Sequence, residues 1–345
     1  MFDLLDHYRV NELHVRDDAA SGLKAFIAIH NTRFGPALGG CRFISYDSTD
    51  DALLDAVRLA RGMSYKAVLS GVPQGGGKSV IMKPHGQFDS EAIFRCFGRF
   101  VEDLGGRYIT AIDSGTTARE MDWINKETRH VTSTSSEDNP AIYTARGVFE
   151  GLKAAVRYKL GNEHLQGIRV AVQGIGNVGY QLCQLLHEAG ASLLVSDINQ
   201  DALKRAQADF SAQVVDPDNI YDAECEVFSP CGLGSIINDE TLQRLRCAIV
   251  AGSANNQLKH HQHGQWLHDE GILYAPDYVI NAGGLVYASL HHLGKPQQLI
   301  EDKTKRIAHT LSEIFKQSEQ KGLATSVMAD QLAEQRLYQK LSEAA

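Results

Sequence analysis

The chain of 345 residues contains 43% hydrophobic and 22% charged side chains, the proportions of a globular protein, and its length predicts about two domains. Its 34 basic and 42 acidic residues give a formal net charge of −8 without a basic cluster, which argues against binding to nucleic acid. It has no basic leader, no apolar run of the roughly 18 residues that a membrane helix needs, and only scattered cysteines. We therefore expect a cytoplasmic protein with reduced thiols and no membrane span.

Strand-like and helix-like patterns alternate in the first part of the chain. A stretch at 131–143 is rich in Ser, Thr, Asp and Asn and contains Pro140, so it predicts a boundary after the first domain. In chain order, the elements predicted before this boundary are a strand at 22–30, a helix at 50–70, a strand at 79–82, a helix at 90–104 and a strand at 107–111.

A second series of strands and helices follows the boundary. It begins with a helix at about 144–158, and the last 50 residues or so also have helical patterns. Strands separated by helices predict a parallel sheet covered on both faces. We therefore predict two α/β domains, 1–140 and 141–324, with a cleft between them and a C-terminal helix, 325–345, that packs back on the first domain. The predicted strands of the second series are 168–173, 191–196, 226–228, 247–251 and 272–274.

A glycine motif opens the second series. Gly174, Gly176 and Gly179 follow a predicted strand at the spacing G-x-G-x-x-G, and a second strand ends at Asp197. Such glycines permit a tight turn, a close approach of the backbone to a pyrophosphate and close packing of helix and strand. The N–H groups at the start of the helix favour the phosphates. The motif predicts a dinucleotide site in a Rossmann domain, formed by Gly174, Ile175, Gly176, Asn177, Val178, Gly179 and Asp197.

Asp197 also indicates which dinucleotide binds. Its carboxylate can accept hydrogen bonds from the ribose hydroxyls of the adenosine half and would repel a 2′-phosphate. The next residues, Ile198 and Asn199, bring no cation to offset this charge. We therefore predict NAD rather than NADP as the cofactor. The structural alternative is an ordinary strand-to-helix turn.

A second glycine-rich segment, Gly75 to Ser79, has the sequence GGGKS. It resembles the end of a phosphate-binding loop, but Val72 stands where that motif needs its first glycine. We predict a loop that brings the backbone close to a small ligand, with Lys78 at its edge. A simple turn into the strand at 79–82 is the alternative.

Lys66, Lys78 and Asp113 are the candidate chemical groups of the first domain. If both lysines reach one site, one can act as a base while the other stays charged and holds an anion. Asp113 follows a predicted strand, where α/β sheets place functional residues. The alternatives are a solvated side chain for Lys66 and a helix N-cap for Asp113.

Six segments resemble the amino-acid dehydrogenase family of leucine, valine, phenylalanine and glutamate dehydrogenases, and most of all its leucine-specific members. The similarity covers nearly the whole chain. The segments are GPALGGCRF (35–43), MSYKAVLSGVPQGGGKSVI (63–81), RYITAIDSGTT (107–117), VAVQGIGNVG (170–179), VAGSANNQL (250–258) and YAPDYVINAGGL (274–285).

This resemblance implies reversible oxidative deamination of an L-amino acid to the 2-oxo acid and ammonia by a homo-oligomer. The first domain would bind the substrate and form oligomer contacts, and the second would bind NAD. Lys66 would bind the substrate carboxylate, Lys78 would act in acid–base catalysis, and Asp113 would assist proton transfer at the amino group. The remaining residues that the resemblance assigns to substrate or nicotinamide are Gly39, Thr144, Asn255, Asn256 and Asn281.

The resemblance also bears on the substrate. Glutamate-specific members carry a lysine at the position of Leu38, where burying the carboxylate of glutamate without a partner would cost several kcal/mol. We therefore expect an apolar amino acid, with leucine and its branched relatives favoured and phenylalanine as the alternative. The predicted pocket residues are Leu38, Ala111, Leu285 and Ala288.

The sequence argues against two other classes of function. A phosphate-loop kinase is opposed by the miscounted motif, and an inactive NAD-binding regulator by the presence of Lys66, Lys78 and Asp113. Histidines cluster at 260–268, but we predict a polar surface segment there and no metal site.

Overall fold

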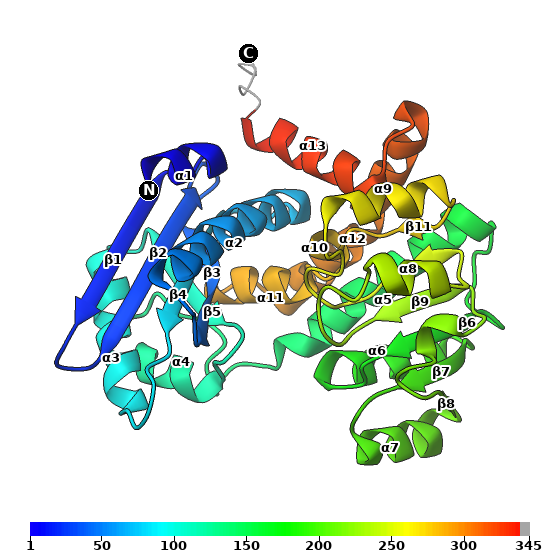
Figure 1. Cartoon of the computed structure of the whole chain (residues 1–345), viewed down its shortest axis with the longest axis horizontal. Helices are drawn as coiled ribbons and strands as arrows, with labels where there is room; N and C mark the ends of the chain where they lie inside the picture. Colours follow the sequence, from blue (N-terminus) through cyan, green and yellow to red (C-terminus); the bar gives the residue numbers. More distant parts are fainter. Residues whose placement is uncertain (339–345) are drawn as a thin grey trace. The chain divides into compact units, whose positions relative to one another are not determined.

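Two β-sheets organise the computed structural model, which describes residues 1–338 (Figure 1). Each sheet belongs to its own unit of helices and strands. Unit 1 contains Met1–Asn139, Ala288–Pro296 and the end of the described chain from Leu337. Unit 2 contains Pro140–Tyr287 and Gln297–Arg336. The predicted α/β class is confirmed, and residues 339–345 of the predicted C-terminal helix lie outside the described residues.

The sheet of unit 1 is mixed. Its strand order is β1-β2-β4-β3-β5, in which β1, β2 and β4 pair antiparallel while β3 runs parallel to both β4 and β5. The three parallel strands therefore end at the same edge of the sheet. The strands are β1 (Glu12–Asp18), β2 (Leu23–Asn31), β3 (Ala37–Ile44), β4 (Gly75–Met82) and β5 (Tyr108–Ile112).

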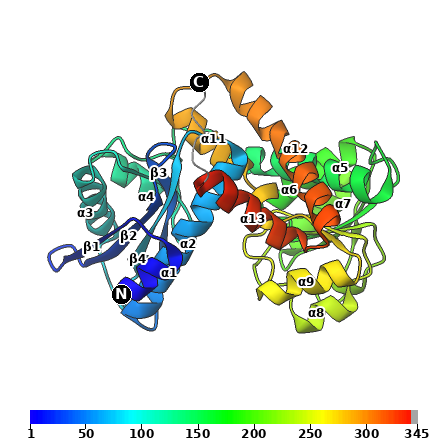
Figure 2. The ribbon, with the colours of Figure 1, turned by 90° about the horizontal axis from the view of Figure 1, so that it is seen from above.

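Helices cover both faces of this sheet, α3 and α4 on one side and α1 and α2 on the other (Figure 2). The sequence sets the ends of α2. The hydroxyl of Ser48 accepts a hydrogen bond from the N–H of Asp51, and Gly71 ends the helix at a φ of 64°. The helices are α1 (Phe2–Tyr8), α2 (Thr49–Ser70), α3 (Ser90–Asp103) and α4 (Ala118–Asn125).

The glycine-rich segment of unit 1 forms a strand, so the predicted loop is wrong. Gly75, Gly76 and Gly77 begin β4, the central strand of the sheet. A Cβ on Gly76 would collide with the backbone of Ser64 in α2. The glycines are therefore required by close packing of α2 on β4, and not by a turn. Because a strand stands where a strand-to-helix loop would be needed, a phosphate-binding loop is excluded as well.

The sheet of unit 2 is entirely parallel. Its order, β11-β10-β9-β6-β7-β8, is that of the doubly wound dinucleotide-binding fold, with the order reversing between β6 and β9. The predicted parallel sheet is confirmed. The strands are β6 (Arg169–Gln173), β7 (Ser192–Ser196), β8 (Gln213–Val214), β9 (Val227–Pro230), β10 (Ile249–Val250) and β11 (Leu273–Tyr274).

The helices of unit 2 also form two layers. In Figure 2, α5, α6, α7 and α12 lie on one side of the sheet and α8 and α9 on the other. Gly147 and Gly151 let α5 approach its neighbours, because a Cβ at either position would crowd Ile307 or Leu311 of α12. The bounds are α5 (Pro140–Leu160), α6 (Asn177–Glu188), α7 (Gln200–Phe210), α8 (Asp239–Arg244), α9 (His261–Asp269), α10 (Asp277–Ile280), α11 (Gly283–His292), α12 (Gln297–Lys321) and α13 (Thr325–Tyr338), with a 3₁₀ turn at Ile220–Asp222.

The sequence patterns missed several elements of the fold. The strands β1, β3 and β8 and the helix α1 were not predicted. Within residues 1–338, no helix is both long enough and apolar enough to cross a membrane.

The contact between α2 and β4 yields a stability prediction. We expect Gly76→Ala to lower the free energy of unfolding by about 1–3 kcal/mol, because the new methyl group would press on the backbone of Ser64. Gly62→Ala is the matched control, since a Cβ there meets no atom within 4 Å and should raise the helix stability by about 0.5–1 kcal/mol. Urea denaturation of both variants measures the difference, and equal midpoints would contradict the packing argument.

Candidate functional site

A buried ion pair joins two strands of unit 1. Lys78 lies in the middle of β4, Asp113 directly follows β5, and the ammonium group of Lys78 contacts Oδ2 of Asp113. The side chains are only 6% and 18% exposed. The strand between them, β3, has Gly40 near this pair, and a Cβ on Gly40 would lie 2.7 Å from the Cβ of Asp113. The missing side chain therefore makes room for the Asp113 carboxylate.

The charges around Asp113 keep it ionised. Burial by itself would raise the pKa of this carboxyl group, but the Lys78 ammonium and the Arg42 guanidinium outweigh burial and hold the pKa below its ordinary value. The carboxylate can therefore accept hydrogen bonds near neutral pH. This is the charge state that a group assisting proton transfer from an amino group needs.

The loop that carries Asp113 is fixed by hydrogen bonds. The hydroxyl of Thr116 donates to the carbonyl oxygen of Cys41 at 3.0 Å and accepts from the N–H of Asp113 at 2.9 Å. The next helix, α4, has Thr117 as its N-cap. The alternative that Asp113 caps this helix is therefore wrong, and the Asp113 side chain does not serve as an N-cap.

Arg42, Asp55 and Tyr46 extend the ion pair, and none of them was predicted as a site residue. Arg42 is on β3, and its Nε donates to Oδ2 of Asp113 at 3.2 Å while a terminal nitrogen donates to Asp55 of α2 at 2.7 Å. The hydroxyl of Tyr46 also donates to Asp55, at 2.7 Å. Arg42 was visible in the motif GPALGGCRF, but nothing in the sequence shows which carboxylates it meets.

The other predicted residues of unit 1 lie on elements next to this pair. Leu38 and Gly39 precede Gly40 on β3, and Ala111 of β5 is the partner of Gly40 across the strands. Leu38 is 1% exposed. Lys66 is half-buried on α2, two residues after Ser64. That both lysines reach one site stays a prediction.

The glycine motif of unit 2 forms the turn between β6 and α6. Gly174 has a φ of +90°, and a Cβ there would lie 2.6 Å from the N–H nitrogen of Gly232. A Cβ on Gly179 would collide with the carbonyl oxygen of Gly174, so this glycine lets the helix pack on the turn. A Cβ on Gly176, the N-cap of α6, would meet no atom within 4 Å. Gly176 therefore borders open space, as a backbone that a pyrophosphate approaches would.

Asp197 is held at the end of β7, next to this turn. Its Oδ2 accepts a hydrogen bond from the N–H of Ile175 at 2.7 Å, and Oδ1 accepts one from the N–H of Asn199 at 2.8 Å. Both oxygens keep a lone pair for a further donor, such as a ribose hydroxyl. The side chain of Ile198 is 90% exposed and carries no charge.

Polar side chains lie near the ends of other unit 2 elements. The side-chain nitrogen of Asn281 donates to Oδ1 of Asn255 at 2.8 Å and to the carbonyl oxygen of Ser253 at 3.0 Å. The buried Oδ1 of Asn281 has no hydrogen-bond partner among residues 1–338. Such an acceptor fits the carboxamide N–H of a nicotinamide ring. Asn256, next to Asn255, is exposed and adopts a φ of 51°.

Thr144 and the start of α11 are neighbours. The hydroxyl of Thr144 donates to the carbonyl oxygen of Pro140 at 3.1 Å, and a Cβ on Gly284 would lie 2.6 Å from that hydroxyl oxygen. Leu285 and Ala288 lie three residues apart on α11, hence on one side of the helix. Leu285 belongs to unit 2 and Ala288 to unit 1, so a substrate pocket shared with Leu38 and Ala111 stays a prediction.

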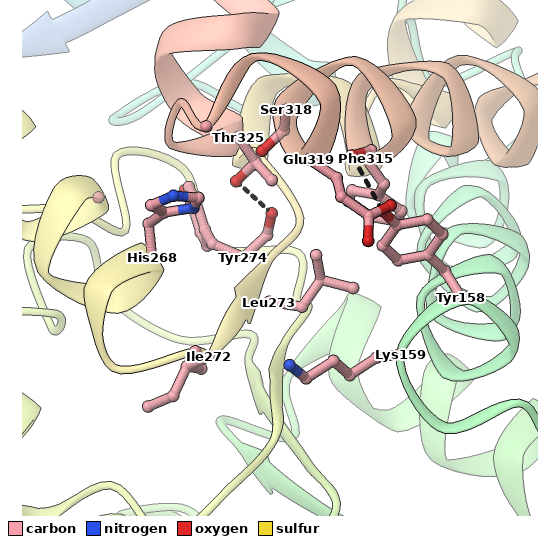
Figure 3. Close-up of a pocket in the computed structure, with 13 residues that line it drawn as sticks. Tyr158, Lys159, His268, Ile272, Leu273, Tyr274, Phe315, Ser318, Glu319 and Thr325 are labelled. Carbon is pink, nitrogen blue, oxygen red and sulfur yellow. Dashed lines mark hydrogen bonds between the residues drawn. The ribbon is translucent and has the colours of Figure 1, made fainter.

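A separate pocket of about 340 Å³ lies in unit 2 (Figure 3). Residues of α5, α9 and α12 line it. Two lining residues are joined by a hydrogen bond, which the hydroxyl of Tyr158 donates to Glu319 at 2.6 Å. The pocket adjoins the residues that lead into β11, whereas the glycine turn follows the carboxyl end of β6. Because all strands of this sheet are parallel, the pocket and the glycine turn lie at opposite ends of the strands. None of the predicted site residues lines this pocket.

The histidine cluster caps a helix. His260 is the N-cap of α9, and its N–H donates to Nδ1 of His263. His263 is buried, with Nε2 3.2 Å from a carboxylate oxygen of Asp239. In the part of the chain that the structure describes, no group of three or more His, Cys, Asp or Glu residues is arranged to hold a metal ion.

Comparison with known protein families identifies the chain's relatives. Residues 7–130 match the family model of the Glu/Leu/Phe/Val dehydrogenase dimerisation domain. Residues 137–200 and 195–340 match the model named Glutamate/Leucine/Phenylalanine/Valine dehydrogenase. The chain belongs to this family. It is an amino-acid dehydrogenase, an oxidoreductase of a family that uses nicotinamide cofactors, and the resemblance found in its sequence is confirmed.

Individual relatives agree with the family assignment. Leucine dehydrogenase of Thermoactinomyces intermedius is 48% identical over 98% of this chain and 93% of its own length. Phenylalanine dehydrogenase of Bacillus thermotolerans is 43% identical over 93% of this chain and 86% of its own length. The crystal structure of L-tryptophan dehydrogenase from Nostoc punctiforme superimposes with a TM-score of 0.88 at 40% identity and covers 98% of both chains.

The open space at Gly176 yields a binding prediction. We expect Gly176→Val to fold with an unchanged Tm, since no atom opposes the new side chain, but to weaken dinucleotide binding by about tenfold or more. Titration of NADH fluorescence measures the affinity. Gly179→Ala is the contrasting variant and should lower the Tm, because its methyl group would meet the carbonyl oxygen of Gly174. Wild-type affinity in Gly176→Val would show that the phosphates do not approach this glycine.

Proposed function

We propose that the protein catalyses the NAD-dependent, reversible oxidative deamination of an apolar L-amino acid, with leucine and its branched relatives favoured. The products are the 2-oxo acid and ammonia. The observation that carries this proposal is the buried pair of Lys78 and Asp113 in the same sheet as Leu38, a side chain that is 1% exposed. The similarity to leucine dehydrogenases over nearly the whole chain supports the same conclusion.

In this proposal, the residues of unit 1 bind the substrate and move its protons. A bound nicotinamide ring supplies the acceptor for the hydride that leaves the substrate Cα. Lys66 holds the substrate carboxylate, and Lys78 deprotonates the water molecule that adds to the resulting iminium carbon. Asp113, kept ionised by its two cationic neighbours, takes and returns protons at the substrate nitrogen. Gly39 of β3 is the proposed backbone contact of the amino acid.

Unit 2 binds NAD in the same proposal. The glycine turn and the first N–H groups of α6 receive the pyrophosphate, and Asp197 receives the ribose hydroxyls. Asn255, Asn256, Asn281 and Thr144 serve the nicotinamide end. Asp197 favours NAD over NADP because its fixed carboxylate has no cation at 198 or 199 to offset a 2′-phosphate.

The side chain that is accepted follows from the apolar residues. A substrate carboxylate placed against buried Leu38 would lose its hydration without gaining a partner, so glutamate is disfavoured by several kcal/mol. Leu285, Ala111 and Ala288 complete an apolar pocket in this proposal. Phenylalanine is the second candidate, because two of these four residues are alanines and a phenylalanine dehydrogenase is 43% identical.

We further propose that the protein works as a homo-oligomer in the cytoplasm. The match of residues 7–130 to a dimerisation domain supports self-association. All six cysteines are free thiols, as a reducing compartment would keep them.

A matrix of substrates and cofactors tests the proposed function. We expect NADH formation with L-leucine and NAD at alkaline pH, with kcat/KM at least about 100-fold lower for L-glutamate because of the unpaired carboxylate. NADP should replace NAD poorly. L-valine, L-isoleucine, L-phenylalanine and L-tryptophan complete the panel. Absence of turnover with every amino acid would identify an inactive dinucleotide-binding protein, and a preference for glutamate would overturn the pocket argument.

The role of Lys78 gives a second test. We expect Lys78→Ala to lower kcat by about a thousandfold, the loss of a general base, while NADH binding to unit 2 stays unchanged. Lys83→Ala is the matched control, because Lys83 is exposed just beyond the end of the same strand. Absorbance of NADH gives the rate and fluorescence titration the affinity. Near-normal kcat in Lys78→Ala would remove this lysine from the mechanism.

A further inference from the structure

Arg42 bridges two carboxylates that come from different layers of unit 1. Its Nε is 3.2 Å from Oδ2 of Asp113, after β5, and its NH1 nitrogen is 2.7 Å from Oδ2 of Asp55, on α2. The Arg42, Asp55 and Asp113 side chains are 16%, 13% and 18% exposed. The guanidinium group therefore connects the loop that carries Asp113 to a helix packed on the sheet.

The far end of this bridge is itself held in place. The hydroxyl of Tyr46 donates to the same Asp55 oxygen that Arg42 contacts, at 2.7 Å. Arg58, one turn along α2, contacts the other oxygen of Asp55 at 3.2 Å. Arg42 and Tyr46 hold one oxygen of Asp55, whereas the ion pair with the exposed Arg58 adds little. Asp55 fixes the orientation of Arg42 in turn.

At the near end, two cations share one oxygen of Asp113. Lys78 contacts Oδ2 from β4, and Arg42 contacts it from β3. Lys78 alone could hold the carboxylate, but it would do so with a flexible chain and a single point of charge. A lysine that also exchanges protons with water cannot serve as a constant anchor. Arg42 keeps its charge at every working pH.

We propose that Arg42 is a positioning residue for the deamination reaction, which orients Asp113 through the bridge from Asp55. This inference rests on the proposed function. A planar guanidinium can donate to two carboxylates in fixed directions, whereas a lysine ammonium cannot span both with the same geometry. Arg42 holds Asp113 in place while Lys78 changes its protonation state during the reaction.

A double-mutant cycle between Arg42 and Asp113 tests this inference. We expect Arg42→Gln to lower kcat by about 100-fold, as misplacing a proton-transfer group does, with little change in the KM for leucine or NAD. In the Asp113→Asn background, Arg42→Gln should change kcat no further, because its only route to the reaction is gone. Arg42→Lys should behave like Arg42→Gln. Equal effects of Arg42→Gln in both backgrounds would overturn the inference.

Two further variants test the contacts of Asp55 at the far end of the bridge. Asp55→Asn removes the anchor of Arg42 and should lower kcat by a smaller factor, again only when Asp113 is present. Arg58→Gln is the control, because Arg58 is exposed and touches Asp55 without reaching Asp113. Its kcat should equal that of the wild type, and a loss as large as that of Asp55→Asn would overturn the bridge.

Urea denaturation of the four proteins of the double-mutant cycle separates this inference from the proposed function. These are the wild type, Arg42→Gln, Asp113→Asn and the double variant. If Arg42 holds Asp113, Arg42→Gln should lower the urea midpoint more in the wild type than in Asp113→Asn, whether or not the protein turns over amino acids. Absence of NADH formation by the wild type would reject the proposed function. Additive shifts of the urea midpoint would reject the contact between Arg42 and Asp113 even in an active enzyme.

Discussion

The ion pair between Lys78 and Asp113 is the interaction on which the candidate chemistry depends. A charged pair that is mostly buried is stable only if the surrounding groups replace the lost water. Here Arg42 adds a second cation to Asp113, and Thr116 fixes the backbone of the same residue. The glycines of β3 and β4 serve the same end, because they let the strands and α2 pack closely around these charges. The architecture of unit 1 thus keeps a cation and an anion paired in one largely buried place.

The regular elements with clear periodicity were predictable, and the irregular ones were not. The 22 residues of α2 combine an N-cap, an acidic first turn and a terminal glycine, all local signals. By contrast, β3 contains Gly39 and Gly40 and has no strand-like composition, so only its two parallel neighbours reveal it. The prediction of a loop at Gly75 to Gly77 was wrong for a related reason. Glycine is typical of turns, and its use for contact between a strand and a helix becomes visible only when α2 is in place.

The candidate site shows the same division. Lys78 and Asp113 could be named from motifs, and the glycine turn with Asp197 from spacing alone, because these are short patterns. Arg42, Asp55 and Tyr46 could not be assigned roles, since nothing in a sequence says that a β3 arginine meets carboxylates 13 and 71 residues away. The hydrogen bond of Asp197 with the N–H of Ile175 is another long-range contact of this kind. Motifs give the chemical groups, and the fold decides which of them touch.

The division of the chain into units has a consequence for how the molecule is made. Unit 1 is not a continuous segment, because Ala288–Pro296 and the described residues from Leu337 belong to it. His291 contacts Glu137 at 3.2 Å, and Arg33 donates to the carbonyl oxygen of Leu337 at 2.7 Å. During synthesis, the contacts of the amino-terminal segment are therefore complete only after the chain has been made as far as Leu337. A fragment cut after Asn139 would lack these partners, so it would not contain every contact of unit 1.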